Sequence, residues 1–138
     1  LGGIEVTGAR GLDGHSDADV LTHAIGEALL GALALGDLGR VFPDTDPRYR
    51  GISSVVLLER VMALVRERTG RLVNVDATVI CQAPRLAPHL AAMQERLAAA
   101  LGVEATAMSV KAKSPEYLGL LGREEGIAAM AVVAVDVP

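Results

Sequence analysis

The chain has 138 residues, of which 51% are hydrophobic, with no tryptophan, one phenylalanine and two tyrosines. This length suits one domain over residues 1–138, whose core must be built from Ala, Val and Leu because aromatic side chains are scarce. The net charge of −4 excludes general nucleic-acid affinity, because no basic stripe is available to neutralise phosphates.

Two amphipathic helices are expected in the first half of the chain. Apolar residues recur at three- and four-residue spacing from Leu21 to Leu33, which predicts a helix that begins near residue 16. Ser16 or Asp17 is the expected N-cap, and Gly36 stands where this helix should stop. The same spacing predicts a second helix over about residues 53–68.

Strands dominate the second half. Residues 72–81 alternate between apolar and polar side chains and are rich in β-branched residues, as strands are, and residues 106–113 alternate again. Residues 88–101 have helical spacing, and Gly102 is the expected cap. Residues 127–137 are nearly all apolar, which predicts a central strand buried on both faces. The order of elements predicts an α+β domain, with a mixed β-sheet covered by helices on one side.

The location expected for this chain is the cytoplasm, without membrane contact. Its longest apolar runs are far shorter than the roughly 20 residues that a membrane helix needs. Its first eight residues lack the charged start and apolar segment of a signal peptide. The single cysteine, Cys81, cannot form an intramolecular disulfide and is expected to be a buried thiol. Because the first residue is not Met, we expect an upstream segment.

A row of polar side chains interrupts the first predicted helix. Asp19, His23 and Glu27 are four residues apart and therefore share one helix face. A neutral imidazole is a good zinc ligand, and a neighbouring carboxylate can ligate beside it or orient it. A buried histidine hydrogen-bonded to Asp19 without a metal fits the same spacing. One histidine cannot hold a metal alone, and the others, His15 and His89, can be structural.

Carboxylates gather in residues 36–46, where Asp37, Asp44 and Asp46 share one loop. Such a group can coordinate a hard cation or accept hydrogen bonds from sugar hydroxyls. Ordinary turn chemistry explains it as well, because Asp before Pro or Gly is common in turns. The pattern leaves both interpretations open.

Residues 110–126 place cations and a hydroxyl after a strand, together with Glu116. Cations, a hydroxyl and backbone N–H groups suit a phosphate, and a carboxylate among them suits a bridging magnesium ion. An exposed glycine-rich turn is the alternative. The polar side chains concerned are Lys111, Lys113, Ser114, Glu116 and Arg123.

Three segments, GHSDADVLTHAIGEALLGALALGDLGRVFPDTDP, CQAPRLAPH and VKAKSPEYLGLLGREEG, together resemble the 2-C-methyl-D-erythritol 2,4-cyclodiphosphate synthases. The resemblance runs from about Leu1 to the C-terminus, and HSDxDVxxH followed by GDxGxxFPDTD is highly specific. It implies a phosphorus–oxygen lyase of the non-mevalonate isoprenoid pathway. Such an enzyme converts 4-diphosphocytidyl-2-C-methyl-D-erythritol 2-phosphate to the 2,4-cyclodiphosphate and releases CMP. The 2-phosphate attacks the β-phosphorus within the same molecule.

The resemblance also implies roles for individual residues. His23 would ligate zinc or manganese, together with an Asp and a His that are one residue apart in a first strand upstream of Leu1. Glu116 would ligate magnesium on the diphosphate. The residues implied in catalysis are His15, Ser16, Asp44 and Ser114. Those implied in substrate binding are Asp37, Leu38, Gly39, Asp46, Cys81, Arg85, Leu86, Ala87, Ala112, Lys113 and Arg123.

The resemblance further implies a homotrimer with active sites at subunit junctions and a cavity on the trimer axis that binds an isoprenoid diphosphate. Near that cavity this chain departs from the family pattern, because Leu120 replaces a common aromatic residue and Met130 a common acidic residue. Lys113 and Pro115 likewise replace part of a threonine run. Two alternatives are a noncatalytic trimeric binding module and the C-terminal half of an enzyme fused to a cytidylyltransferase.

Overall fold

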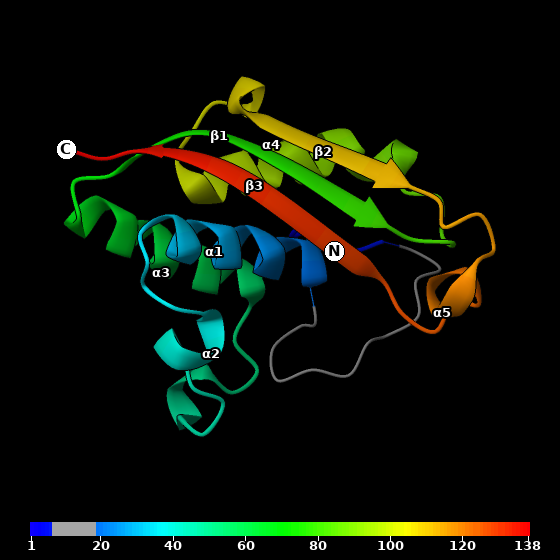
Figure 1. Cartoon of the computed structure of the whole chain (residues 1–138), viewed down its shortest axis with the longest axis horizontal. Coiled ribbons are helices and arrows are strands. Elements are labelled where there is room, and N and C mark those ends of the chain that lie inside the picture. The colour runs from blue at the N-terminus through cyan, green and yellow to red at the C-terminus, as the bar shows by residue number, and fades with distance from the viewer. Residues whose placement is uncertain (7–18) are drawn as a thin grey trace.

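The structure is a computed structural model that describes residues 1–6 and 19–138 (Figure 1). Helices and a small sheet make up an α+β fold, as the order of elements predicts. In chain order the elements are α1 (Val20–Ala32), α2 (Leu38–Val41), α3 (Ser54–Glu67), β1 (Arg71–Ile80), α4 (Leu90–Leu101), β2 (Met108–Lys113), α5 (Gly119–Gly122) and β3 (Ala128–Asp136).

Helix α1 begins later than its apolar pattern predicts. Its N-cap is Asp19, whose side chain accepts a hydrogen bond from the backbone N–H of Thr22. The predicted start near residue 16 is therefore wrong, and Ser16 and Asp17 themselves lie outside the described residues. The helix also ends at Ala32, four residues before Gly36, where the chain turns toward α2.

The predictions for α3 and α4 are confirmed to within two residues. Ser53 caps α3 by accepting a hydrogen bond from the backbone N–H of Val55 at 3.2 Å. Gly102 ends α4 with φ of 70°, a left-handed conformation that glycine adopts without strain. A short 3₁₀ turn, Ala87–His89, precedes α4. Local caps therefore define both helices.

The sheet is mixed, with the order β2-β1-β3. Strand β1 pairs parallel with β2 and antiparallel with β3. The prediction that residues 127–137 form a central strand buried on both faces is wrong, because β3 lies at an edge of the described sheet. Its Val133 and Val135 pack against the core, whereas Met130 and Val132 are 60% and 71% exposed. The apolar pattern of β3 covers both faces, but the helices cover only one.

Helices α1, α3 and α4 lie on one face of the sheet and bury the core between the two layers (Figure 1). Aliphatic side chains fill this core, among them Leu21, Ile25, Leu29, Val61 and Val79, each with no exposed area. Helical coverage on one side is as predicted. In the described part of the chain, no helix combines the length and the apolar character that a membrane span requires.

Candidate active site

Asp19 is a buried carboxylate that joins the N-terminal segment to the start of α1. It is 3% exposed, and its oxygens accept hydrogen bonds from the backbone N–H groups of Gly2 at 2.9 Å and Gly3 at 2.7 Å. Thr22 donates two more, from its backbone at 3.1 Å and from its hydroxyl at 2.7 Å. Burial alone would raise the pKa of Asp19, but the hydrogen bonds from Thr22, Gly3 and Gly2 outweigh burial and lower it.

His23 lies one turn further along α1, and a hydrogen bond between its ring and a residue of α3 fixes the ring. Its Nε2 atom is 2.8 Å from the hydroxyl oxygen of Ser54, a residue that is 1% exposed. A histidine that binds a metal through one ring nitrogen commonly has the other held by a hydrogen bond. His23 therefore has the support that a metal ligand needs.

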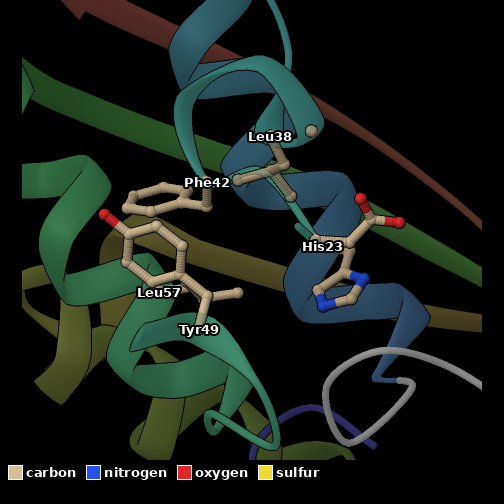
Figure 2. A pocket seen from close by; sticks show the side chains of 7 residues that line it. His23, Leu38, Phe42, Tyr49 and Leu57 are labelled. Atoms are coloured by element: carbon tan, nitrogen blue, oxygen red, sulfur yellow. The ribbon is translucent and has the colours of Figure 1, made fainter. Parts of the chain in front are cut away.

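His23 also lines a cavity of about 290 Å³ between α1, α2 and α3. Figure 2 shows its imidazole facing the space bounded by Leu38 above and by the rings of Phe42 and Tyr49 on the other side. The two aromatic rings meet edge to face, with centroids 5.2 Å apart. The described residues that line this cavity are His23, Leu38, Gly39, Phe42, Asp44, Tyr49 and Leu57.

Ligands for a metal are incomplete in the described residues. Within residues 1–6 and 19–138, no three His, Cys, Asp or Glu side chains lie close enough together to hold a metal ion. The chemistry of His23 fits one position of a zinc or manganese site. The remaining ligands of such a site would have to come from elsewhere.

The predicted aspartates of residues 36–46 separate in the structure. Asp44 lines the His23 cavity. Asp37 caps α2 by accepting a hydrogen bond from the backbone N–H of Arg40 at 2.8 Å. Asp46 pairs with Arg48 at 2.7 Å, and the hydrogen bonds from the Arg48 side chain and backbone lower the pKa of Asp46. Turn chemistry thus accounts for the contacts of two of the three carboxylates.

Glu27, the third member of the row on α1, anchors the start of α2. Its Oε1 atom accepts a hydrogen bond from the backbone N–H of Leu38 at 2.5 Å. Leu38 and Gly39 both line the His23 cavity, so Glu27 holds one wall of it in place. Each residue of the row, Asp19, His23 and Glu27, therefore ties α1 to a different part of the chain.

A second cavity, of about 190 Å³, lies where β1 and β2 end. Because these strands are parallel, residues that follow or end them meet at the same sheet edge. The backbone N–H of Cys81 donates to the carbonyl of Lys113 at 3.0 Å, which ties the two segments together. Seven residues implied in substrate binding or catalysis meet here: Cys81, Arg85, Leu86, Ala87, Ala112, Lys113 and Ser114.

Cys81 is a buried thiol, as predicted, with 8% of its area exposed. Burial raises the pKa of this thiol, and the charge of Glu124 acts in the same direction. Its Sγ atom donates a hydrogen bond to the carbonyl of Ala83 at 3.0 Å. Cys81 is therefore suited to form part of a wall rather than to act as a nucleophile.

Other predicted residues lie outside both cavities. The backbone N–H of Glu116 donates to the hydroxyl oxygen of Ser114 at 3.0 Å, and Arg123 pairs with Glu125 at 2.8 Å on the surface. His15 and Ser16 lie outside the described residues.

Sequence reasoning missed two side chains that support the cavities. Ser54 follows the cap residue Ser53 and has no pattern that distinguishes it from a second helix cap. Gln82 accepts a hydrogen bond from the backbone N–H of Tyr117 at 2.9 Å and so holds the loop after β2 against the second cavity.

Comparisons with known proteins agree over nearly the whole chain. A synthase of Dechloromonas aromatica, named 2-C-methyl-D-erythritol 2,4-cyclodiphosphate synthase, is 58% identical over 99% of this chain and 85% of its own length. The solved structure of the bifunctional IspDF from Campylobacter jejuni is 38% identical, with a TM-score of 0.94 over 99% of this chain, which spans 37% of that longer chain. A CDP complex of IspF from Plasmodium falciparum is 28% identical, with a TM-score of 0.79 over 91% of this chain and 75% of that one. The resemblance seen in the sequence is confirmed, and since the model of the YgbB family matches residues 1–136, the chain belongs to that family.

Proposed function

We propose that this protein converts 4-diphosphocytidyl-2-C-methyl-D-erythritol 2-phosphate to 2-C-methyl-D-erythritol 2,4-cyclodiphosphate and releases CMP, as a phosphorus–oxygen lyase. The proposal depends most on the 58% identity between this chain and the 2-C-methyl-D-erythritol 2,4-cyclodiphosphate synthase of Dechloromonas aromatica, over 85% of the length of that protein. The cavity at the ends of β1 and β2 supports it, because residues from two separate segments line one space there. A CDP complex of a relative with the same fold supports a cytidine nucleotide as the ligand.

The reaction requires alignment of two phosphates within one molecule. An oxygen of the 2-phosphate forms a bond to the β-phosphorus, and the bond from that phosphorus to the oxygen bridging to the α-phosphorus breaks. CMP leaves with the bridging oxygen and its electron pair, so no outside reactant is consumed. The protein contributes by holding the reacting groups close and by neutralising their charge.

The two cavities suit the two ends of this substrate. The wall of the second cavity from Cys81 to Ala87 offers backbone groups to a base, and Lys113 and Ser114 offer donors to phosphates. In the His23 cavity, Leu38 and Gly39 would hold the methylerythritol hydroxyls, and Asp44 would lie near the reacting groups. His15 and Ser16 would close over the methylerythritol phosphate.

Divalent metals belong to the proposal. His23 would supply one ligand to zinc or manganese, and Glu116 would ligate magnesium on the diphosphate. When bound, the metals would polarise the phosphates and reduce their mutual repulsion. The hydrogen bond between His23 Nε2 and the Ser54 hydroxyl supports the first assignment.

We also infer a homotrimer whose active sites lie at subunit junctions. The uncovered face of the sheet exposes apolar side chains, including Val73 at 43%, Met130 at 60% and Val132 at 71%. These side chains, which lie beside the Asp76–Lys111 ion pair, need a partner to exclude water, and in a ring of three copies each chain would be covered by its neighbours. Binding of an isoprenoid diphosphate on the trimer axis stays a prediction, with Leu120 as the residue to test.

Val132→Asp is expected to convert the trimer to smaller species, because a charge on the sheet face cannot be buried without a partner. Light scattering coupled to size-exclusion chromatography measures the mass. Val56→Asp places the same charge on α3, where the side chain is 37% exposed, and should leave the mass unchanged. A trimeric Val132→Asp variant, or a wild-type monomer, would contradict the proposed interface.

The proposed reaction is tested with the purified protein, the cytidylyl substrate, magnesium and zinc or manganese. We expect one CMP for each cyclic diphosphate formed, as followed by ³¹P NMR. A metal-loaded protein that binds CDP but releases no CMP would instead be a noncatalytic binding module.

A further inference from the structure

Among the described residues, two cations and no carboxylate line the second cavity. Arg85 reaches it from the loop after β1, and Lys113 from the last residue of β2. The other described residues that line it are neutral: Cys81, Gln82, Pro84, Leu86, Ala87, Ala112 and Ser114. A site of this composition attracts a multiply charged anion more strongly than a neutral or singly charged group.

We infer that Lys113 binds the diphosphate of the cytidine nucleotide and supplies enough charge for that binding, as distinct from turnover, to proceed without a divalent cation. This inference rests on the proposed function and refines it, because it assigns the positive charge that faces the diphosphate to the side chain of Lys113.

The neighbouring lysine shows why Lys113 differs. Lys111 lies on the same side of β2, two residues earlier, and its Nζ atom is 2.9 Å from a carboxylate oxygen of Asp76 on β1. Lys113 stands opposite Ile80 in the parallel register, where β1 offers no carboxylate. Among the described residues, Lys113 takes part in none of the ion pairs. The charge of Lys111 is therefore neutralised within the sheet, whereas Lys113 lines the second cavity and takes part in none of these ion pairs.

Ser114 adds a donor beside this cation. Its hydroxyl oxygen accepts a hydrogen bond from the backbone N–H of Glu116 at 3.0 Å, which restrains the side chain. A hydroxyl that accepts in this way still has its own proton to donate. A phosphate beside Lys113 would thus meet a flexible ammonium and a restrained hydroxyl, and a lysine can follow a phosphate without the fixed geometry that arginine demands.

The test measures CDP affinity by calorimetry for the wild type and Lys113→Thr, each with magnesium and with EDTA at one ionic strength. Chelation is expected to change wild-type affinity by less than about threefold. In EDTA, Lys113→Thr should bind CDP about tenfold more weakly, since a charge-assisted hydrogen bond is lost, and magnesium should restore part of the loss. The affinity for CMP, which has one phosphate fewer than CDP, should fall less than the affinity for CDP when Lys113 is replaced by Thr.

Two matched variants complete the design. Lys111→Thr removes a lysine that is already paired and should bind CDP as the wild type does, whereas Lys113→Arg should keep most of the affinity in EDTA. Equal CDP affinities of Lys113→Thr and wild type in EDTA would overturn the role of Lys113 while leaving the proposed function intact. The role of Lys113 would also be overturned if chelation of magnesium weakened CDP binding by the same factor in the wild type and in Lys113→Thr. A wild type that binds neither CDP nor CMP would overturn both proposals.

Discussion

Replacing Asp19 by alanine is expected to lower the free energy of unfolding by about 3 kcal/mol, from a lost helix cap and from buried N–H donors left without an acceptor. Asp19 accepts hydrogen bonds from Gly2, Gly3 and Thr22, and alanine can replace none of them. Urea unfolding of wild type and variant at pH 7 measures the difference. Asp136→Ala is the matched control, because it breaks only an exposed ion pair with Arg71 and should cost less than about 1 kcal/mol.

The carboxylate of Asp19 also makes the free energy of unfolding depend on pH in the acidic range. The pKa of Asp19 is lower in the folded protein than in the unfolded chain, so the folded state binds this proton more weakly. Its contribution is fully present above the unfolded pKa of about 3.9 and is lost as the pH falls through the lower folded pKa. Wild type should therefore lose more stability between pH 5 and pH 2 than Asp19→Ala does. Equal losses in the two proteins would show that Asp19 does not provide this contribution.

Local sequence predicts α3 and α4 well, because each has its apolar spacing and its cap within a few residues of chain. The start of α1 could not be predicted in this way. Ser16, Asp17 and Asp19 are all suitable caps, and the sequence near the helix does not distinguish them. In the structure Asp19 also binds Gly2 and Gly3, which are 17 and 16 residues away. The start of α1, which local propensity does not define, thus coincides with a contact between residues far apart in the sequence.

Strand β3 illustrates a different ambiguity. Apolar residues on both faces are expected for a strand between two helix layers, and equally for a strand whose second face meets another chain. The pattern of residues 127–137 is the same in both cases. Only the order β2-β1-β3, with helices on one face, separates them, and this order depends on how the whole chain packs.

Sequence patterns alone left all three candidate sites open, and the family resemblance grouped their residues. The structure adds the physical reason why residues 81–87 and 112–114 lie together. Parallel pairing of β1 with β2 brings the ends of both strands to one edge, with Cys81 bonded to the carbonyl of Lys113. The hydroxyl of Ser54 could not be assigned beforehand, because its partner His23 is 31 residues away on another helix.

His23→Ala is expected to abolish zinc retention and to slow CMP release by about a thousandfold, since a metal that polarises a phosphate contributes several kcal/mol to catalysis. His23 is half-buried at a cavity wall, so its loss should leave the helical circular dichroism unchanged. Elemental analysis of the purified protein measures zinc per chain. One zinc still bound per chain of His23→Ala would contradict the assignment.

Two serines at the start of α3 separate a role in holding the His23 ring from a role in holding the helix. Ser54→Ala removes the hydrogen bond to His23 Nε2 and should weaken zinc binding by about 10- to 100-fold. Ser53→Ala removes the helix cap and should lower stability by about 1 kcal/mol without changing zinc affinity. If both variants weakened zinc binding equally, the cause would be a less stable start of α3 and not the loss of the hydrogen bond between Ser54 and His23. If only Ser54→Ala did so, α3 would act on the metal through the orientation of one imidazole.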